Sequence, residues 1–301
     1  MAREVKIAVV QTGPAGPDKE ENLKRAWDQV EDLAGKEKLD FIAFPELFTT
    51  PFWCVGFSHQ EFFAWAERIP GPTTEILGEK ARKHQCHIIA PIFEKGPLEG
   101  EYYNSAALIG PDGKVIWGVL PGGAKIPAVR KNYISHFRWG EMVNDEKFYF
   151  RPGPGYPIFD TEKGKIGMLV CYSRWYPEGW RVLALRGAQI IFAPSASAGY
   201  VYDMWVCGFR THAAENVIFA VGINKAGIEK VREKDTRYYG MSLITGPDGR
   251  IIAQAPEAEP GVVLATIDLD EIVTGRQRIM FFRDRRPEIY GPLTVISDAI
   301  D

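Results

Sequence analysis

The sequence predicts an α/β protein: a four-layer α-β-β-α sandwich in a single domain with approximate two-fold internal similarity. Two observations lead to this prediction. Both halves of the chain alternate short apolar strands with helices in the same order, and each half closes on a Gly-Pro-Asp-Gly turn, at 110–113 and 246–249. The strands are also apolar on both faces, so each sheet must be covered twice. One continuous, doubly wound sheet is the alternative arrangement.

The first half begins with a strand and an amphipathic helix. The helix carries Leu23, Trp27, Val30 and Ala34 on one stripe, which predicts that this face packs on a sheet. The expected elements are, in order, a strand over 6–11, the helix over about 20–35, a strand over 41–44, helical segments around 60–85, a strand over 87–93 and a hairpin with its turn at 110–114.

The second half repeats this order. Pro177 followed by Glu178 is typical of the first turn of a helix, because proline has no N–H to leave unpaired there. The expected elements are a strand over 165–170, a helix over about 177–187, a strand over 189–194, a helix around 203–216, a strand over 217–223 and a hairpin with its turn at 246–250.

Composition limits the class of function. A chain of 301 residues that is 46% hydrophobic can bury a large core. The net charge of −3 provides no basic field for nucleic acid. The four cysteines show no close pairing, which is typical of a reduced, intracellular protein. No apolar stretch approaches the ~18 residues of a membrane span, and no signal peptide is visible, so we expect a cytoplasmic protein.

Cys171 stands at the most informative point of the chain. It ends the apolar run 166–170 and precedes the helix expected from Pro177. Backbone N–H groups and the positive end of a helix dipole would favour its thiolate form, the reactive one. A lone buried cysteine is more often inert, so other residues of the sequence must indicate whether Cys171 is catalytic.

Two glutamates have unusual surroundings. Glu46 follows the strand 41–44 directly and lies among Phe44, Pro45, Leu47 and Phe48. A partly desolvated carboxylate there suits a general base or acid. Glu146 is likewise embedded among aromatic residues.

Together these segments resemble the carbon–nitrogen hydrolase family, the nitrilase superfamily. The similarity runs over nearly the whole chain and is carried by Phe44-Pro-Glu-Leu-Phe48, Tyr103-Asn-Ser-Ala-Ala-Leu-Ile109, Glu146-Lys-Phe-Tyr-Phe-Arg-Pro-Gly153, and the segment from Val170-Cys-Tyr-Ser-Arg-Trp-Tyr-Pro-Glu178 to Ser195. The resemblance implies an α-β-β-α sandwich, a Glu–Lys–Cys triad, no metal or other cofactor, and a homodimer or higher homo-oligomer. It also implies that 1–301 form one domain whose tail, about 275–301, extends along a partner subunit.

The lysine motif departs from the family pattern. Lys131-Asn-Tyr-Ile-Ser135 resembles the family's Lys-x-His-[Ile/Leu]-Pro, with tyrosine for histidine and serine for proline. The segment 119–128 precedes it and is interpreted as an added hairpin. Lys125, in this segment, is the competitor for the triad. We favour Lys131, and the resemblance implies that Glu146 orients it and keeps it protonated.

The residues around Cys171 suggest the substrate class. Nitrilases typically follow the cysteine with Trp-Glu, whereas Tyr172 and Ser173 stand here. In hydrolases of N-carbamoyl amino acids, an arginine at the position of Arg174 is associated with the substrate carboxylate. A guanidinium can grip a carboxylate through two parallel hydrogen bonds. The expected substrate is therefore an N-carbamoyl amino acid such as N-carbamoyl-β-alanine, with release of ammonia and CO2.

Alternatives remain open at this point. The substrate could be a small aliphatic or ω-amide, or the chain could be a catalytically silent, oligomeric scaffold. A papain-like Cys–His pair lacks a local signature, and the cysteines and histidines lack metal-ligand spacing. Besides Arg174, we expect Tyr172, Ser195 and His136 to line the substrate site.

Overall fold

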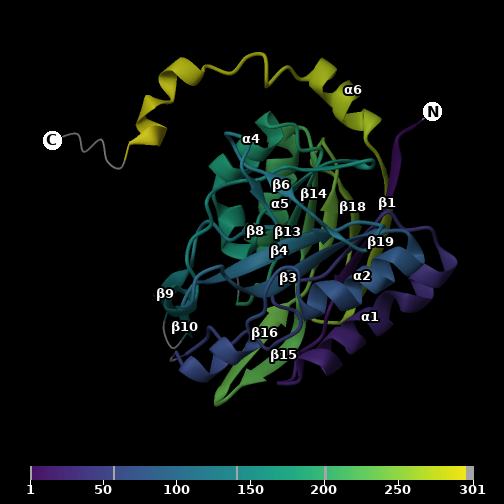
Figure 1. Ribbon diagram of the computed structural model, residues 1–301. Helices are drawn as coiled ribbons and strands as arrows, with labels where there is room; N and C mark the ends of the chain where they lie inside the picture. Colours follow the sequence, from purple (N-terminus) through teal and green to yellow (C-terminus); the bar gives the residue numbers. More distant parts are fainter. Residues whose placement is uncertain (1, 57, 140–141, 200–201, 296–301) are drawn as a thin grey trace.

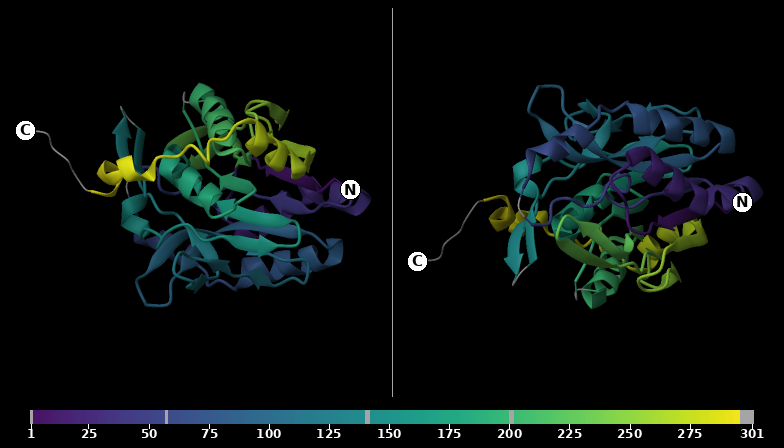
Figure 2. Two further views of the ribbon diagram at one scale, coloured as in Figure 1. Left: turned by 90° about the horizontal axis from the view of Figure 1, so that it is seen from above. Right: turned by 90° about the horizontal axis from the view of Figure 1, so that it is seen from below.

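The computed structural model describes residues 2–56, 58–139, 142–199 and 202–295 (Figure 1). Two main sheets pack face to face, and helices cover the outer face of each, as the two views of Figure 2 show. The predicted four-layer α-β-β-α sandwich in a single domain is confirmed. No helix within the described ranges is both long and apolar enough to cross a membrane.

The first sheet has a parallel centre, β1–β2–β3, with antiparallel strands on either side. Its spatial order is β19 (Gly261–Asp268), β1 (Glu4–Gln11), β2 (Phe41–Ala43), β3 (His87–Lys95), β4 (Tyr102–Ile109) and β5 (Val115–Ile116), and β8 (Ala128–Arg130) also pairs with β4. The helices α1 (Lys19–Lys36) and α2 (Pro72–His84) cover its outer face, and η1 (Gln60–Trp65) is a short 3-10 helix.

The second sheet repeats this plan with the parallel centre β12–β13–β14. Its spatial order is β11 (Phe159–Thr161), β12 (Gly164–Met168), β13 (Ile190–Pro194), β14 (Phe219–Ile223), β17 (Leu243–Thr245) and β18 (Ile251–Gln254). The helices α4 (Pro177–Leu185) and α5 (Tyr202–Asn216) lie outside it. The approximate two-fold similarity is therefore visible in both strand order and helix placement.

Strand β1 shows why both faces had to be apolar. Ile7 and Val9 belong to the core between the two sheets, whereas Ala8 and Val10 pack under α1 and α2. Successive side chains of a strand point to opposite faces, so a fully covered strand needs both sets apolar. The stripe of α1 predicted from Leu23 to Ala34 is buried on the same face of this sheet.

Within the described residues, three two-stranded hairpins lie outside the two main sheets. The insert predicted at 119–128 is a hairpin, β6 (Gly118–Val119) and β7 (Lys125–Ile126). Two further hairpins were not predicted: β9 (His136–Trp139) with β10 (Met142–Asp145), and β15 (Ala226–Val231) with β16 (Lys234–Tyr239). A short helix, α3 (Glu146–Tyr149), follows β10.

The C-terminal segment leaves the sandwich. After α6 (Asp270–Arg278) it runs over the outer surface through η3 (Pro287–Ile289) and η4 (Gly291–Thr294), at the top of Figure 1. Residues 296–301 of the predicted tail lie outside the described residues.

Candidate active site

The site forms where strand ends from the two sheets meet. Glu46 follows β2, Asn104 lies on β4 and Lys131 follows β8, all in the first sheet. Cys171 and Ala196 follow β12 and β13 of the second sheet. The catalytic candidates therefore converge only because the two halves pack face to face, and neither half contains them all.

Glu46 is completely buried, and each of its oxygens accepts hydrogen bonds. Oε1 accepts from Lys131 Nζ at 2.9 Å and from Asn104 Nδ2 at 2.7 Å. Oε2 accepts from the backbone N–H of Ala196 at 2.9 Å. Three donors from three segments thus fix the orientation of this carboxylate, which a proton-transfer group requires.

Lys131 lies between two carboxylates. Its Nζ is fully buried and contacts Glu46 and Glu146, the latter at 2.8 Å from Oε1 and 2.6 Å from Oε2. Glu146 also accepts a 2.8 Å hydrogen bond from Ser135 Oγ. Asn144 Oδ1 accepts from both Ser135 Oγ and the Glu146 backbone N–H. Lys131 precedes the β9–β10 hairpin and Glu146 follows it, so the hairpin brings Glu146 back into contact with Lys131.

Burial and ion pairing act against each other on these groups. Burial alone would lower the pKa of Lys131, but the charges of Glu146 and Glu46 outweigh it, and the pKa is raised above its usual value. Burial raises the pKa of Glu146, which Lys131 partly counteracts. The lysine therefore stays protonated and supplies a fixed positive charge.

Cys171 begins a 3-10 helix, η2 (Cys171–Trp175), rather than lying at the start of α4. It has a φ of 45°, in the left-handed region that L-residues rarely adopt. Strained backbone of this kind concentrates at functional sites. The backbone N–H of Tyr172 belongs to the first turn of η2, where no intrahelical acceptor exists, and it donates to no group among the residues that the structure describes.

The expectation of a resting thiolate at Cys171 is wrong. Burial, followed by the charge of Glu46, raises the pKa of the thiol to about 12, and the nearby Lys131 and Arg174 offset only part of this. The predicted helix dipole is weaker because a 3-10 turn, not α4, follows the cysteine. Cys171 therefore rests as a thiol, so a nucleophilic role would require a base that takes its proton during attack.

Arg174 is 6% exposed and lies between two indole rings. Its guanidinium carbon is 4.6 Å from the ring centroid of Trp175 and 4.9 Å from that of Trp205. Nη2 donates to Ser197 Oγ at 3.3 Å. In the part of the chain that the structure describes, no carboxylate forms an ion pair with it. A buried guanidinium in this state has donors to spare for an anion.

The other predicted site residues differ in their placement. Tyr172 packs edge-on against Tyr176, beside the nucleophile. The Ser195 hydroxyl donates to Ala193 O at 3.2 Å. The residue that follows it, Ala196, is the one whose backbone N–H bonds to Glu46. His136 lies on the exposed β9–β10 hairpin, with Nδ1 3.1 Å from Asp145 Oδ1. A substrate role for Ser195, which is buried, or for His136, which is exposed, stays a prediction.

Lys125 is exposed at the end of the β6–β7 hairpin, whereas Lys131 is buried beside Glu46. Sequence reasoning missed Asn104, Ser135, Asn144 and the Ala196 N–H. Asn104 and Ser135 carried a signal, because each lies in a segment already similar to the family. The others act through hydrogen bonds that no local pattern reveals.

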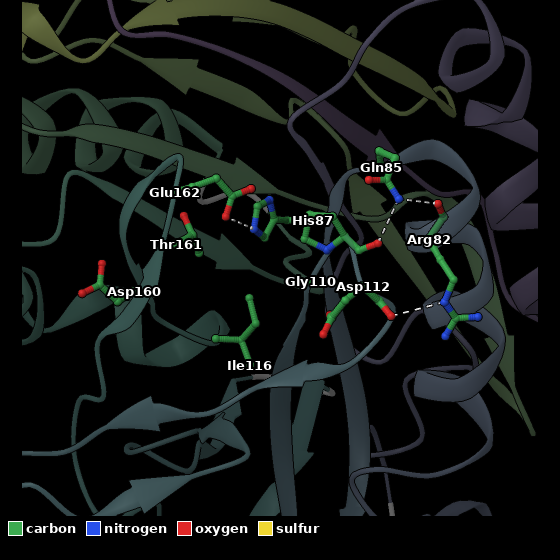
Figure 3. Close-up of a pocket in the computed structure, with 10 residues that line it drawn as sticks. Arg82, Gln85, His87, Gly110, Asp112, Ile116, Asp160, Thr161 and Glu162 are labelled. Atoms are coloured by element: carbon green, nitrogen blue, oxygen red, sulfur yellow. Dashed lines mark hydrogen bonds and ion pairs between the residues drawn. The ribbon is translucent and has the colours of Figure 1, made fainter.

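A hollow of about 530 Å³ lies at the opposite ends of the parallel strands (Figure 3). His87 opens β3 there, with Nε2 3.5 Å from Glu162 Oε2, and Asp112, Asp160 and Arg82 line the rim. Its lining contains no cysteine and none of the triad candidates. This hollow is therefore separate from the catalytic cluster.

Comparisons with known proteins find relatives over nearly the whole chain. The sequence model described as carbon-nitrogen hydrolase matches residues 6–277. The chain is similar to an N-carbamoylputrescine amidase of Solanum lycopersicum, at 31% identity over 88% of this chain and 87% of the relative. It is equally similar, 31% over 96% and 98%, to a citrullinase of Francisella tularensis. A carbon-nitrogen hydrolase structure from Helicobacter pylori superposes with a TM-score of 0.87 at 27% identity, covering 97% of this chain and 99% of that one.

Proposed function

Since this chain belongs to the carbon-nitrogen hydrolase family, we propose that it hydrolyses N-carbamoyl amino acids, with N-carbamoyl-β-alanine as the reference substrate. The family establishes an enzyme acting on carbon–nitrogen bonds other than peptide bonds. The names of its relatives support an N-carbamoyl compound as substrate. The proposal goes further by specifying a carboxylate on that compound.

Attack begins at Cys171. Glu46 takes the thiol proton as Sγ bonds to the ureido carbon, because a thiol with a pKa of about 12 holds almost no thiolate at neutral pH. Negative charge then builds on the carbonyl oxygen. Lys131 and the free N–H of Tyr172 stabilise that charge from positions fixed in advance.

Breakdown follows the same path in reverse. Glu46 returns the proton to the terminal nitrogen, the C–N bond breaks, and ammonia leaves an S-carbamoyl enzyme. Glu46 next deprotonates a water molecule, whose oxygen bonds to the same carbon as the C–S bond breaks. The thiol regains its proton, and the released carbamate decomposes to CO2 and the free amino acid.

One observation carries the choice of an N-carbamoyl amino acid. Arg174 is a buried guanidinium with one weak side-chain acceptor, Ser197 Oγ, and no ion-pair partner within the described ranges. An unpaired buried charge is costly, so an anionic substrate group would relieve that cost on binding. A carboxylate there would also hold the ureido carbon over Cys171. A neutral amide would use the triad but leave Arg174 unpaired.

Ammonia release from matched substrates tests the proposal. N-Carbamoyl-β-alanine should be hydrolysed with a much higher kcat/KM than N-propylurea, which replaces the carboxylate with a methyl group. Propionamide and propionitrile represent the amide and nitrile alternatives. Cys171→Ala is the control and should release nothing. Equal rates for the first two substrates would remove the carboxylate from the proposal, and no release from any of them would support a silent scaffold.

The proposal includes assembly of two or more copies. Residues after α6 leave the sandwich (Figure 2). The exposed apolar side chains of this segment are Ile279, Met280, Phe281, Ile289, Leu293 and Val295. Burying such a strip against a second copy would be favourable. Sedimentation should show a dimer or larger for the full chain and a smaller species for a chain ending after Arg278. The same species for both would contradict a role of this tail in assembly.

A further inference from the structure

Two backbone segments set the position of the Glu46 carboxylate. On one side, the N–H of Ala196 bonds to Oε2. On the other, the chain leaves Glu46 through Leu47, whose φ of 48° is unfavourable for leucine, and turns so that Thr50 N–H bonds to Leu47 O at 3.1 Å. Neither segment is regular secondary structure, so something else must hold both in place.

Asn224 holds the first segment. It is fully buried just after β14, and both its Oδ1 and its Nδ2 form hydrogen bonds. Oδ1 accepts from Ser197 N–H at 2.7 Å, and Nδ2 donates to Ser197 O at 3.1 Å and to Gly240 O at 3.0 Å. The amide thus pairs with the backbone of Ser197 as a neighbouring strand would. Ala196 precedes Ser197, so its N–H is directed at Glu46.

Lys225 holds the second segment. Its Nζ donates to Thr50 O at 2.9 Å and to Glu229 Oε2 at 2.9 Å, and both side chains of this ion pair are completely buried. Glu229 in turn accepts from Phe52 N–H at 2.6 Å and Ala15 N–H at 2.8 Å. The buried pair therefore holds the turn that follows Leu47 through two contacts: Lys225 binds the Thr50 carbonyl, and Glu229 binds the Phe52 N–H.

We propose that Asn224 and Lys225, consecutive residues after β14, are positioning residues that hold the Glu46 carboxylate from opposite sides. This inference rests on the proposed role of Glu46 as the proton-transfer group. The two residues differ in reach. Asn224 also fixes Ser197, whose Oγ contacts Arg174. The Lys225–Glu229 pair instead bonds to the turn beyond Glu46 and to Ala15 N–H, and among the described residues it makes no hydrogen bond to Ser197 or Arg174.

This difference predicts separate kinetic signatures. Loss of the Lys225 clamp lowers kcat and leaves KM unchanged, because only the proton-transfer group shifts. Loss of the Asn224 contacts lowers kcat and also raises KM for N-carbamoyl-β-alanine, but not for N-propylurea, because the support of Arg174 shifts too. A displacement near 1 Å at a reacting group lowers kcat by up to ~100-fold.

The first variant is Lys225→Met/Glu229→Gln, which removes both charges so that neither remains buried and unpaired. We expect kcat to fall at least ~10-fold. The matched control is Lys19→Met/Glu67→Gln. That pair lies away from Glu46 and also binds one backbone carbonyl and one backbone N–H. Lys19 Nζ donates to Trp65 O and to Glu67 at 2.8 Å each, and Glu67 accepts from Thr73 N–H at 2.8 Å. The control should keep the wild-type kcat.

The second variant, Asn224→Asp, keeps the shape but loses both Nδ2 donors. Its control is Asn216→Asp, another fully buried amide, whose Nδ2 donates to His212 O at 2.9 Å within α5. Near-ultraviolet circular dichroism would verify folding of all four proteins. An equal loss of kcat in a variant and its control would overturn the proposal, because general destabilisation would then explain it.

A readout without substrate separates this inference from the proposed function. The Glu46 charge raises the pKa of the Cys171 thiol, so moving the carboxylate should lower that pKa. In a Cys207→Ser background, both positioning variants should therefore react faster with iodoacetamide at pH 9 than wild type. An unchanged alkylation profile would overturn the proposal whatever the kcat. If wild type hydrolyses no substrate, the proposed function fails while this comparison still decides the positioning role.

Discussion

Lys131 contacts both oxygens of the Glu146 carboxylate and one oxygen of Glu46, so one ammonium serves two carboxylates. The two-pronged contact makes Glu146 the main counter-charge of the lysine. Glu46 is therefore left with the weaker share of the ion pair, which suits its proposed role as a base.

Glu146→Gln should test this division. The neutral amide leaves Lys131 paired only with Glu46, which stabilises the ionised carboxylate and makes it a poorer base. We expect kcat to fall by ~100-fold, the scale of a lost general base, with KM little changed. A wild-type kcat would show that Glu146 only fills space.

The two candidate lysines should behave very differently. Lys131→Met removes the fixed charge beside the developing oxyanion, and we expect at least ~100-fold loss of the single-turnover release of ammonia. Lys125→Met, on the exposed hairpin, should retain wild-type turnover. The reverse ranking would mean that Lys131 is structural and that the hairpin reaches the substrate.

The Cys171 thiol should titrate unusually high. Iodoacetamide labelling in a Cys207→Ser background should keep rising beyond pH 10, because burial and the Glu46 charge raise the pKa of the thiol to about 12. Glu46→Gln removes that charge, so the pKa falls and labelling at pH 9 becomes faster while turnover is abolished. Slower labelling in Glu46→Gln would instead show that Glu46 deprotonates the thiol for alkylation as well.

Arg174→Lys should separate the substrate classes. An ammonium cannot reproduce the planar, two-pronged contact, so KM for N-carbamoyl-β-alanine should rise. The ratio of its kcat/KM to that of N-propylurea should fall ~10-fold, equivalent to ~1.4 kcal/mol of transition-state binding. A parallel decline for both substrates would make Arg174 a structural support of Cys171.

Much of the fold could be predicted because burial leaves a local signature. The apolar stripe of α1 and the strands that are apolar on both faces indicate which surfaces are buried. The repeated Gly-Pro-Asp-Gly turns indicate the hairpins. The β15–β16 hairpin was missed because its strands, with sequences AGIEKV and KDTRYY, are rich in charged and polar residues. Its anchor is the buried pair Lys225–Glu229, which looks like solvated charge in the sequence.

The site was predicted unevenly for a similar reason. Glu46, Lys131 and Cys171 stand in recognisable segments, so their residue types and order were available. The protonation state of Cys171 was not, because it depends on a carboxylate 125 positions away in the chain and on the loss of water around both. Asn104 and Ala196 each form one hydrogen bond to Glu46, and Ser135 contacts Asn144 and Glu146. No sequence periodicity records such contacts.

Strand β1 pairs with β19 along its whole length, from Glu4 with Asp268 to Gln11 with Gly261. During synthesis, β1 leaves the ribosome well before its partner β19, which follows all the other strands of both sheets. Until then, one edge of β1 presents unpaired N–H and C=O groups that can recruit strands from other nascent chains. Premature termination before β19 therefore yields an aggregation-prone fragment, although every proposed catalytic residue has already been made.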